Sequence, residues 1–246
     1  MAHTLIISDG GVSALLAVAA ASERRRLSGP AGADQSGTLI YVWCAEGPES
    51  PRKASASQVQ ADLYGLPVIP KHIPIWRGEE PDAGWAYTLR VLLEAALLVR
   101  ELGGGEILWP ITAVAAAGGG PNVDELSRTV NAALLVSQLV SLSGPRPVTQ
   151  PSEDLPRAVR VRTPYADLTD RQIADLILDM DLPVWTCWFW GEQDSETQDA
   201  AAKERERWIG VLREAGWTGS FDAVQPRVVV QSPDKPKVRG ATGDLT

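Results

Sequence analysis

Short runs of β-branched and apolar residues alternate with longer helix-forming segments along most of this 246-residue sequence. The first run, Thr4–Ser8, ends at Asp9-Gly10-Gly11 and is followed at once by the Ala- and Leu-rich segment Val12–Arg26. Alternation of this kind indicates a doubly wound, mainly parallel α/β sheet with helices on both faces. Further strands are predicted at Thr38–Trp43, Val68–Ile75, Glu106–Pro110 and Val159–Thr163, and further helices at Ala54–Tyr64, Gly84–Leu102, Val123–Leu142, Thr169–Met180 and Lys203–Ala215.

The length is compatible with one such domain, because α/β domains often reach roughly 200–250 residues. We predict a single domain over residues 1–224 and a loosely ordered tail over residues 225–246, which is rich in Pro, Lys and Gly. The formal net charge of −8 disfavours nucleic acid and anionic membranes as partners. A small-molecule partner is therefore expected, and homodimerisation is left open.

Cysteine usage and apolar run lengths bear on the cellular compartment. The two cysteines, Cys44 and Cys187, cannot build a disulfide framework. No basic segment followed by an apolar stretch and a small-residue cleavage site begins the sequence, and no apolar run reaches the roughly 18 residues of a membrane span. The expectation is a cytoplasmic protein without membrane contact.

The turn after the first predicted strand is the strongest candidate for a ligand site. Glycine and a helix N-terminus leave backbone N–H groups that can bind an anion, and serine hydroxyls add further donors. Ser8, Gly10, Gly11 and Ser13 are therefore predicted to bind a phosphate group of a cofactor. An equally weighted alternative is that the glycines only form a tight turn and that Ser13 caps the helix.

The same turn resembles the Ser-Gly-Gly-x-Asp-Ser loop of the PP-loop ATP pyrophosphatases, of the 7-cyano-7-deazaguanine synthase type. Ser8, Gly10 and Ser13 match that loop, whereas Asp9 replaces a glycine and Val12 replaces the aspartate. Three later segments also resemble family motifs in the same order. They are Gly119-Gly120-Pro121-Asn122 (Gly-Tyr-Pro-Asp), Pro164–Thr169 (Pro-Leu-x-x-Leu-Thr, followed by lysine) and Leu182–Trp188 (Val-Pro-x-x-x-Thr-x-Ser-Cys-Tyr).

The resemblance implies an adenine nucleotide alpha hydrolase-like fold that binds ATP and Mg²⁺. It implies ATP-dependent adenylation of a carboxylate and amide or nitrile formation, as in queuosine biosynthesis, with Pro121 and Asn122 in the substrate loop. Asp170 stands where the family has its lysine, and the other three cysteines of the family's zinc site are absent after Cys187. We therefore expect no zinc or other protein-bound metal site, and assign no catalytic residue.

These departures support an alternative hypothesis, a catalytically inactive pseudoenzyme that acts as a protein-interaction module through the segment around Trp185, Trp188 and Trp190. Packing is nevertheless the favoured interpretation of this aromatic cluster, and an inert buried thiol that of Cys187. His72 is interpreted as structural, and Arg24–Arg26 as the solvated end of a helix whose dipole they complement.

Overall fold

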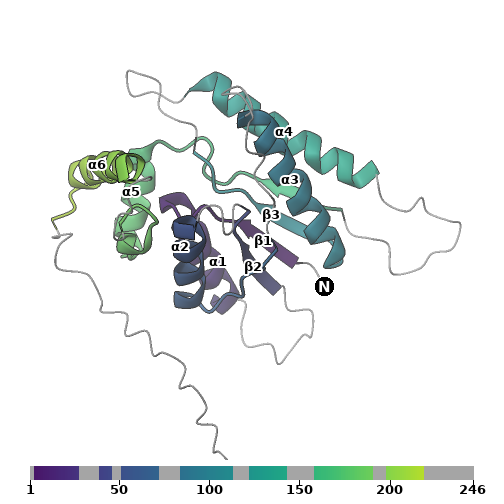
Figure 1. Cartoon of the computed structure of the whole chain (residues 1–246), viewed down its shortest axis with the longest axis horizontal. Helices are drawn as coiled ribbons and strands as arrows, with labels where there is room; N and C mark the ends of the chain where they lie inside the picture. The colour runs from purple at the N-terminus through teal and green to yellow at the C-terminus, as the bar shows by residue number, and fades with distance from the viewer. Residues whose placement is uncertain are drawn as a thin grey trace, which may run out of the picture.

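The computed structural model describes residues 3–27, 39–45, 51–71, 84–112, 122–142, 158–190 and 198–218. Its elements follow the predicted alternation of strands and helices (Figure 1). The predicted tail and His72 lie outside the described residues, as does the second half of the predicted strand Val68–Ile75, residues 72–75. Val68 forms an isolated bridge with Val42. In chain order the elements are β1 (His3–Ile7), α1 (Val12–Leu27), β2 (Leu39–Trp43), α2 (Pro51–Leu63), α3 (Gly84–Glu101), β3 (Gly105–Leu108), α4 (Val123–Leu142), β4 (Arg160–Arg162), α5 (Asp170–Asp179), the 3-10 helix η3 (Val184–Thr186) and α6 (Gln198–Glu214).

The four described strands form one parallel sheet in the order β2-β1-β3-β4. β1 is central, since Thr4 aligns with Ile40 of β2 on one side and with Glu106 of β3 on the other. The chain first adds β2 beside β1 and then crosses to the opposite side of β1 to add β3. The predicted doubly wound α/β fold is confirmed, and its order reverses between β1 and β3.

Successive residues of the strands point to opposite faces of the sheet. Leu5, Ile7 and Ile107 pack beneath α3 and α4, whereas Ile6 and Leu108 pack against α1 and α2. Figure 1 shows these two helix pairs on opposite sides of the strands. Both faces are thus covered, which explains why the strands read as nearly continuous apolar runs.

A third apolar cluster joins α1 to α5, η3 and α6. Phe189, 1% exposed, lies in this cluster, and Trp188 and Trp190 pack around it partly buried. The packing interpretation of the aromatic segment is confirmed. No helix among the described residues is both long enough and apolar enough to cross a bilayer.

Candidate functional site at the ends of β1 and β3

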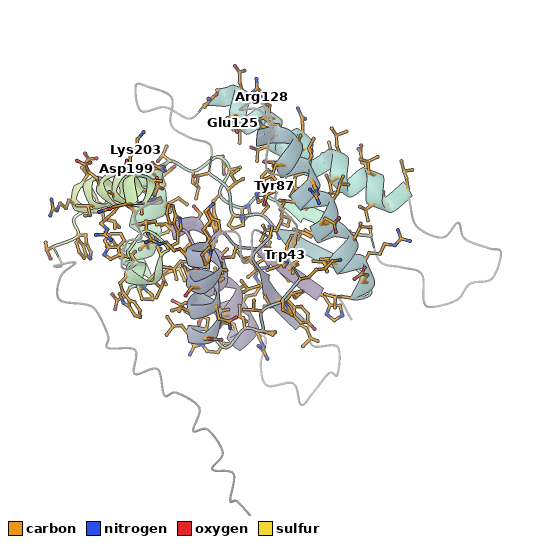
Figure 2. All side chains as sticks on the ribbon, viewed as in Figure 1. Trp43, Tyr87, Glu125, Arg128, Asp199 and Lys203 are labelled. Atoms are coloured by element: carbon orange, nitrogen blue, oxygen red, sulfur yellow. The ribbon has the colours of Figure 1, made fainter. Side chains whose placement is uncertain are left out.

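A cavity of about 200 Å³ opens at the carboxyl ends of β1 and β3, under the first turns of α3. This is the point where the strand order reverses, and in doubly wound folds ligands bind in that crevice. Figure 2 shows the labelled Tyr87 on the side of α3 that faces the strands. The lining residues are Ile7, Ser8, Asp9, Ala45, Tyr87, Thr88, Val91, Trp109, Pro110 and Ile111.

The lining combines an apolar wall with a polar edge. Ile7, Val91 and Trp109 supply apolar surface, and Asp9 supplies an exposed carboxylate. Pockets for drug-sized ligands usually measure about 300–1,000 Å³, so this cavity holds one ring system rather than a whole nucleotide. Any charged remainder of a nucleotide would have to extend past Ser8 and Asp9, toward the beginning of α1.

The turn between β1 and α1 satisfies two of its own amides. The Gly10 N–H donates to Ser8 Oγ at 3.1 Å, and the Gly11 N–H donates to Asp9 Oδ1 at 2.8 Å. The buried Ser8 hydroxyl also shares a hydrogen bond with Ser57 Oγ of α2, at 2.8 Å. The expectation that both glycine amides point at a ligand is therefore not met, because each has an acceptor inside the turn.

Gly10 lies where three segments of the chain meet. Its φ of +68° is in the left-handed region, and a Cβ there would stand 2.7 Å from Ala56 Cβ and 2.8 Å from the Lys53 carbonyl oxygen. Its own carbonyl accepts hydrogen bonds from the Trp188 N–H at 3.0 Å and from Gln60 Nε2 at 3.2 Å. Close packing thus explains this glycine whether or not a ligand binds.

The backbone amides that follow Gly11 belong to the first turn of α1. The Leu15 N–H donates to the Gly11 carbonyl at 3.0 Å, so Gly11, not Ser13, stands at the helix cap. The N–H groups of Val12, Ser13 and Ala14 precede this bond and have no acceptor within the helix. They are the amides through which α1 would meet an anion, and Ser13 is half-buried among them.

The beginning of α2 adds positive charge beside this turn. α2 begins at Pro51, before the predicted Ala54, and its first turn contains Arg52 and Lys53 but no acidic residue. Cations are unfavourable at the positive end of a helix dipole. Lys53 Nζ lies 6.0 Å from the centroid of the Trp188 ring. The close approach of the Lys53 carbonyl to Gly10 places this helix end against the β1–α1 turn. Sequence reasoning did not include these two cations in the helix because it placed the helix start at Ala54.

The other predicted site residues have structural contacts. Asn122 caps α4, since its Oδ1 accepts the Glu125 N–H at 3.2 Å, and it does not line the cavity. Pro121 lies outside the described residues. Asp170 binds Arg207 of α6, with 3.0 Å between Asp170 Oδ2 and Arg207 Nε. The cofactor role of Ser8, Gly10, Gly11 and Ser13 and the substrate role of Pro121 and Asn122 remain predictions.

Cys187 is 2% exposed, below the β1–α1 turn. Burial raises the pKa of its thiol well above the ordinary value, and the negative charges of Asp9 and Glu204 raise it further. The prediction that this thiol is buried is confirmed, and a raised pKa and burial both disfavour the reactive thiolate. Within the described ranges, no three His, Cys, Asp or Glu side chains are grouped so that they could hold a metal ion.

No model of a known protein family matches the sequence, and no curated protein matches it. Among solved structures, the U34-tRNA thiolase NcsA from Methanococcus maripaludis, with its [4Fe-4S] cluster, is similar at 11% sequence identity and a TM-score of 0.44. The match covers 91% of this chain and 73% of that chain. A TM-score this low does not establish a shared fold, so the fold assignment rests on the strand order itself.

Proposed function

We propose that this protein binds an adenine nucleotide at the crevice between the ends of β1 and β3. The observation that carries the proposal is the position of the cavity at the point where the strand order reverses. The base would lie against Trp109 and Val91, and the phosphates would extend over Asp9 toward α1. The choice of adenine follows the resemblance to PP-loop ATP pyrophosphatases in the ordered motifs.

The phosphates would be held by charge as well as by amides. The N–H groups of Val12, Ser13 and Ala14 provide the partial positive charge of a helix end, and Arg52 and Lys53 provide full charges on the adjoining helix. This combination is the one that stabilises pyrophosphate, whose negative charge is spread over several oxygens.

Mg²⁺ fits the same place. The exposed carboxylate of Asp9 would repel a bare phosphate, but Mg²⁺ is commonly bound by one or two carboxylates together with the phosphates of a nucleotide and water. Bound there, Mg²⁺ would supply charge neutralisation for the phosphates. Asp9 would orient it, and the Gly11 amide would hold Asp9 in place.

The resemblance implies the reaction to be tested. In that reaction a substrate carboxylate oxygen attacks the α-phosphorus of ATP, the bond to pyrophosphate breaks, and a nitrogen nucleophile later displaces AMP. Arg52 and Lys53 would stabilise the departing pyrophosphate. A 7-cyano-7-deazaguanine synthase-like activity, with Pro121 and Asn122 at the substrate, is the most specific form of this proposal.

One observation favours a second candidate, a pseudoenzyme that binds the nucleotide without cleaving it. Asp170, which stands in place of the family's lysine, is neutralised by Arg207 and serves to join α5 to α6. That position therefore supplies no cation to the reaction. Pyrophosphate release from ATP by the purified protein, with and without candidate carboxylates, distinguishes the two candidates.

Substitution of Ser13 tests the binding site itself. Ser13→Glu places a carboxylate in the first turn of α1, where acidic residues stabilise a helix, so the protein should fold normally. The new charge should weaken ATP and AMP binding about tenfold or more through repulsion of the phosphates. Isothermal titration calorimetry in the presence of Mg²⁺ measures the change.

Ser13→Gln is the matched control, since it has similar size without the charge and should retain most of the affinity. Equal affinities of the Glu and Gln variants would place the phosphates away from α1. No binding of ATP or AMP by the unsubstituted protein at millimolar concentration, with or without Mg²⁺, would refute the proposed function as a whole.

A further inference from the structure

The outer sides of α3 and α4 carry a concentration of exposed leucine and valine. Leu89, Leu93 and Leu97 follow one another at intervals of four residues, so they share one stripe of α3 and are all exposed. Val130, Leu134 and Leu135 are exposed near the middle of α4, and Leu142 is exposed at its end. A surface helix ordinarily turns polar or charged residues outward, so this pair of helices departs from the rule.

The two helices form one layer of the molecule. They contact each other and cover the same face of the sheet, because residues from both belong to the cluster around Leu5 and Ile107. Figure 1 shows them together on the side of the strands away from α1 and α2. We name the exposed residues Leu89, Leu93, Leu97, Val130, Leu134, Leu135 and Leu142 the α3–α4 face.

Charge is nearly absent from the α4 part of this face. The segment Thr129–Leu142 contains no Asp, Glu, Lys or Arg. The charged residues of α4, among them Glu125 and Arg128, lie toward its beginning, as Figure 2 shows. Burial of this segment would therefore desolvate no charged side chain, a cost that often offsets the gain from apolar contact.

The surface of the layer formed by α3 and α4 is comparable in area to one side of a dimer interface. A 20-residue helix is about 30 Å long and packed helices lie about 8–10 Å apart, so two neighbouring helices present roughly 600 Å². A stable interface of standard size buries about 800 Å² on each partner. The layer of α3 and α4 is thus large enough to hold most of one side of such an interface.

We propose that the α3–α4 face is the interface of a symmetric homodimer, in which α4 of one copy packs antiparallel against α4 of the other. A protein with a net charge of −8 repels its own copies, so self-association requires a surface free of carboxylates, and the charge-free segment of α4 provides it. A two-fold axis near the middle of that segment brings Leu134 and Leu135 of both copies together. This inference is independent of the proposed nucleotide site.

Light scattering on the full chain tests the dimer. The unsubstituted protein should have twice the mass of the 26.4 kDa chain at about 100 μM, because interfaces of standard size have Kd values from about micromolar downward. Leu134→Glu places like charges opposite each other across the axis and should weaken association about 100-fold or more. A monomeric unsubstituted protein would overturn the proposal.

Leu63→Glu is the matched control. Leu63 at the end of α2 is 52% exposed, close to the 54% of Leu134, but lies on the opposite side of the sheet. This variant should remain dimeric. A dimeric Leu134→Glu variant would show that association does not depend on the α3–α4 face. Loss of the dimer in Leu63→Glu would show that a charge on the other side of the sheet has the same effect. Either result would contradict the proposal.

Cross-linking provides a second measurement that does not require a charged substitution. Cys44 and Cys187 are buried, so a short bismaleimide should react first with a cysteine introduced at the surface. Leu134→Cys should give a covalent dimer, and Leu63→Cys should not. Equal cross-linking of the two variants would overturn the α3–α4 interface even if Leu134→Glu failed to fold.

Discussion

Gly10, in the β1–α1 turn, contacts several parts of the chain beside the candidate site. Its backbone approaches α2 so closely that no side chain fits, and its carbonyl accepts two hydrogen bonds, one of them from the segment that contains Trp188. The residue thus fixes the relative positions of β1, α2 and the aromatic cluster. A rigid arrangement of this kind is what keeps helix N-termini aligned on a ligand.

Gly10→Ala should destabilise the protein by about 2–5 kcal/mol, the sum of the left-handed conformation and overpacking against α2. Gly65→Ala should cost only about 1 kcal/mol, because Gly65 has a similar φ of +65° but nothing within 4 Å of its position for Cβ. Urea unfolding of both variants measures the difference. Similar losses for the two variants would contradict the packing role assigned to Gly10.

The sequence predicted the turn between strand and helix, but it did not predict the directions of the amides in that turn. The run Ser8 to Ser13 follows a strand and opens a helix, and local patterns suffice to predict that much. Whether a glycine N–H faces a ligand depends on which side-chain oxygens lie nearby, here those of Ser8 and Asp9. Tyr87, Thr88 and Trp109 could not be assigned to the cavity, because only the folded sheet brings α3 and β3 beside β1.

At the scale of elements, α5 is the helix whose beginning the sequence specified most fully. The Thr169 hydroxyl accepts the Gln172 N–H, and the Gln172 side chain accepts the Thr169 N–H, which forms the predicted capping box. The ion pair between Asp170 and Arg207 then anchors the same end of α5 to α6.

Thr169→Ala should lower the free energy of unfolding by about 1 kcal/mol, since it leaves first-turn amides of α5 without their acceptor. Thr169→Ser retains the hydroxyl and should cost much less. Chemical denaturation of the two variants provides the comparison. Equal stabilities would mean that water or neighbouring groups replace the cap without loss.

Element boundaries were harder to predict than element types. The ends of α4 and the start of α1 agree with the prediction, because apolar spacing and flanking Gly, Pro or Asn mark them. α2 and α6 begin earlier than predicted, at Pro51 and Gln198, since their first turns are polar and have no apolar periodicity. The error in α2 left Arg52 and Lys53 outside the predicted helix, at the end of it that lies against the β1–α1 turn.

At the scale of the whole molecule, the doubly wound class of the fold was predictable, whereas the contacts between its apolar clusters were not. Alternating strands and helices were enough to predict a doubly wound sheet, which the strand order confirms. Tyr64 and Tyr165 lie at the junction of two apolar clusters, one below the sheet and one around Phe189. Burial raises the pKa of both phenols, that of Tyr165 to about 12, with the charge of Arg24 acting in the opposite direction on Tyr165.

These two phenols should make stability decrease in alkali. Because their folded-state pKa values exceed the ordinary value of about 10, their contribution is complete below pH 10 and is lost as the pH rises toward about 12. Thermal unfolding as a function of pH, compared with Tyr165→Phe, measures the effect. The variant should lose less stability over that interval, and an unchanged slope would contradict the role of Tyr165.

The central position of β1 has a consequence for biosynthesis. β1 is made before β3, and Thr4 can pair with its partner on β3 only after Glu106 has been made. Synthesis proceeds at roughly 5–20 residues per second, so several seconds separate the two strands. During that time the apolar run Leu5-Ile6-Ile7 lacks its hydrogen-bonding partner on the β3 side. Among the described strands, β1 is therefore complete long before its pairing with β3 can form.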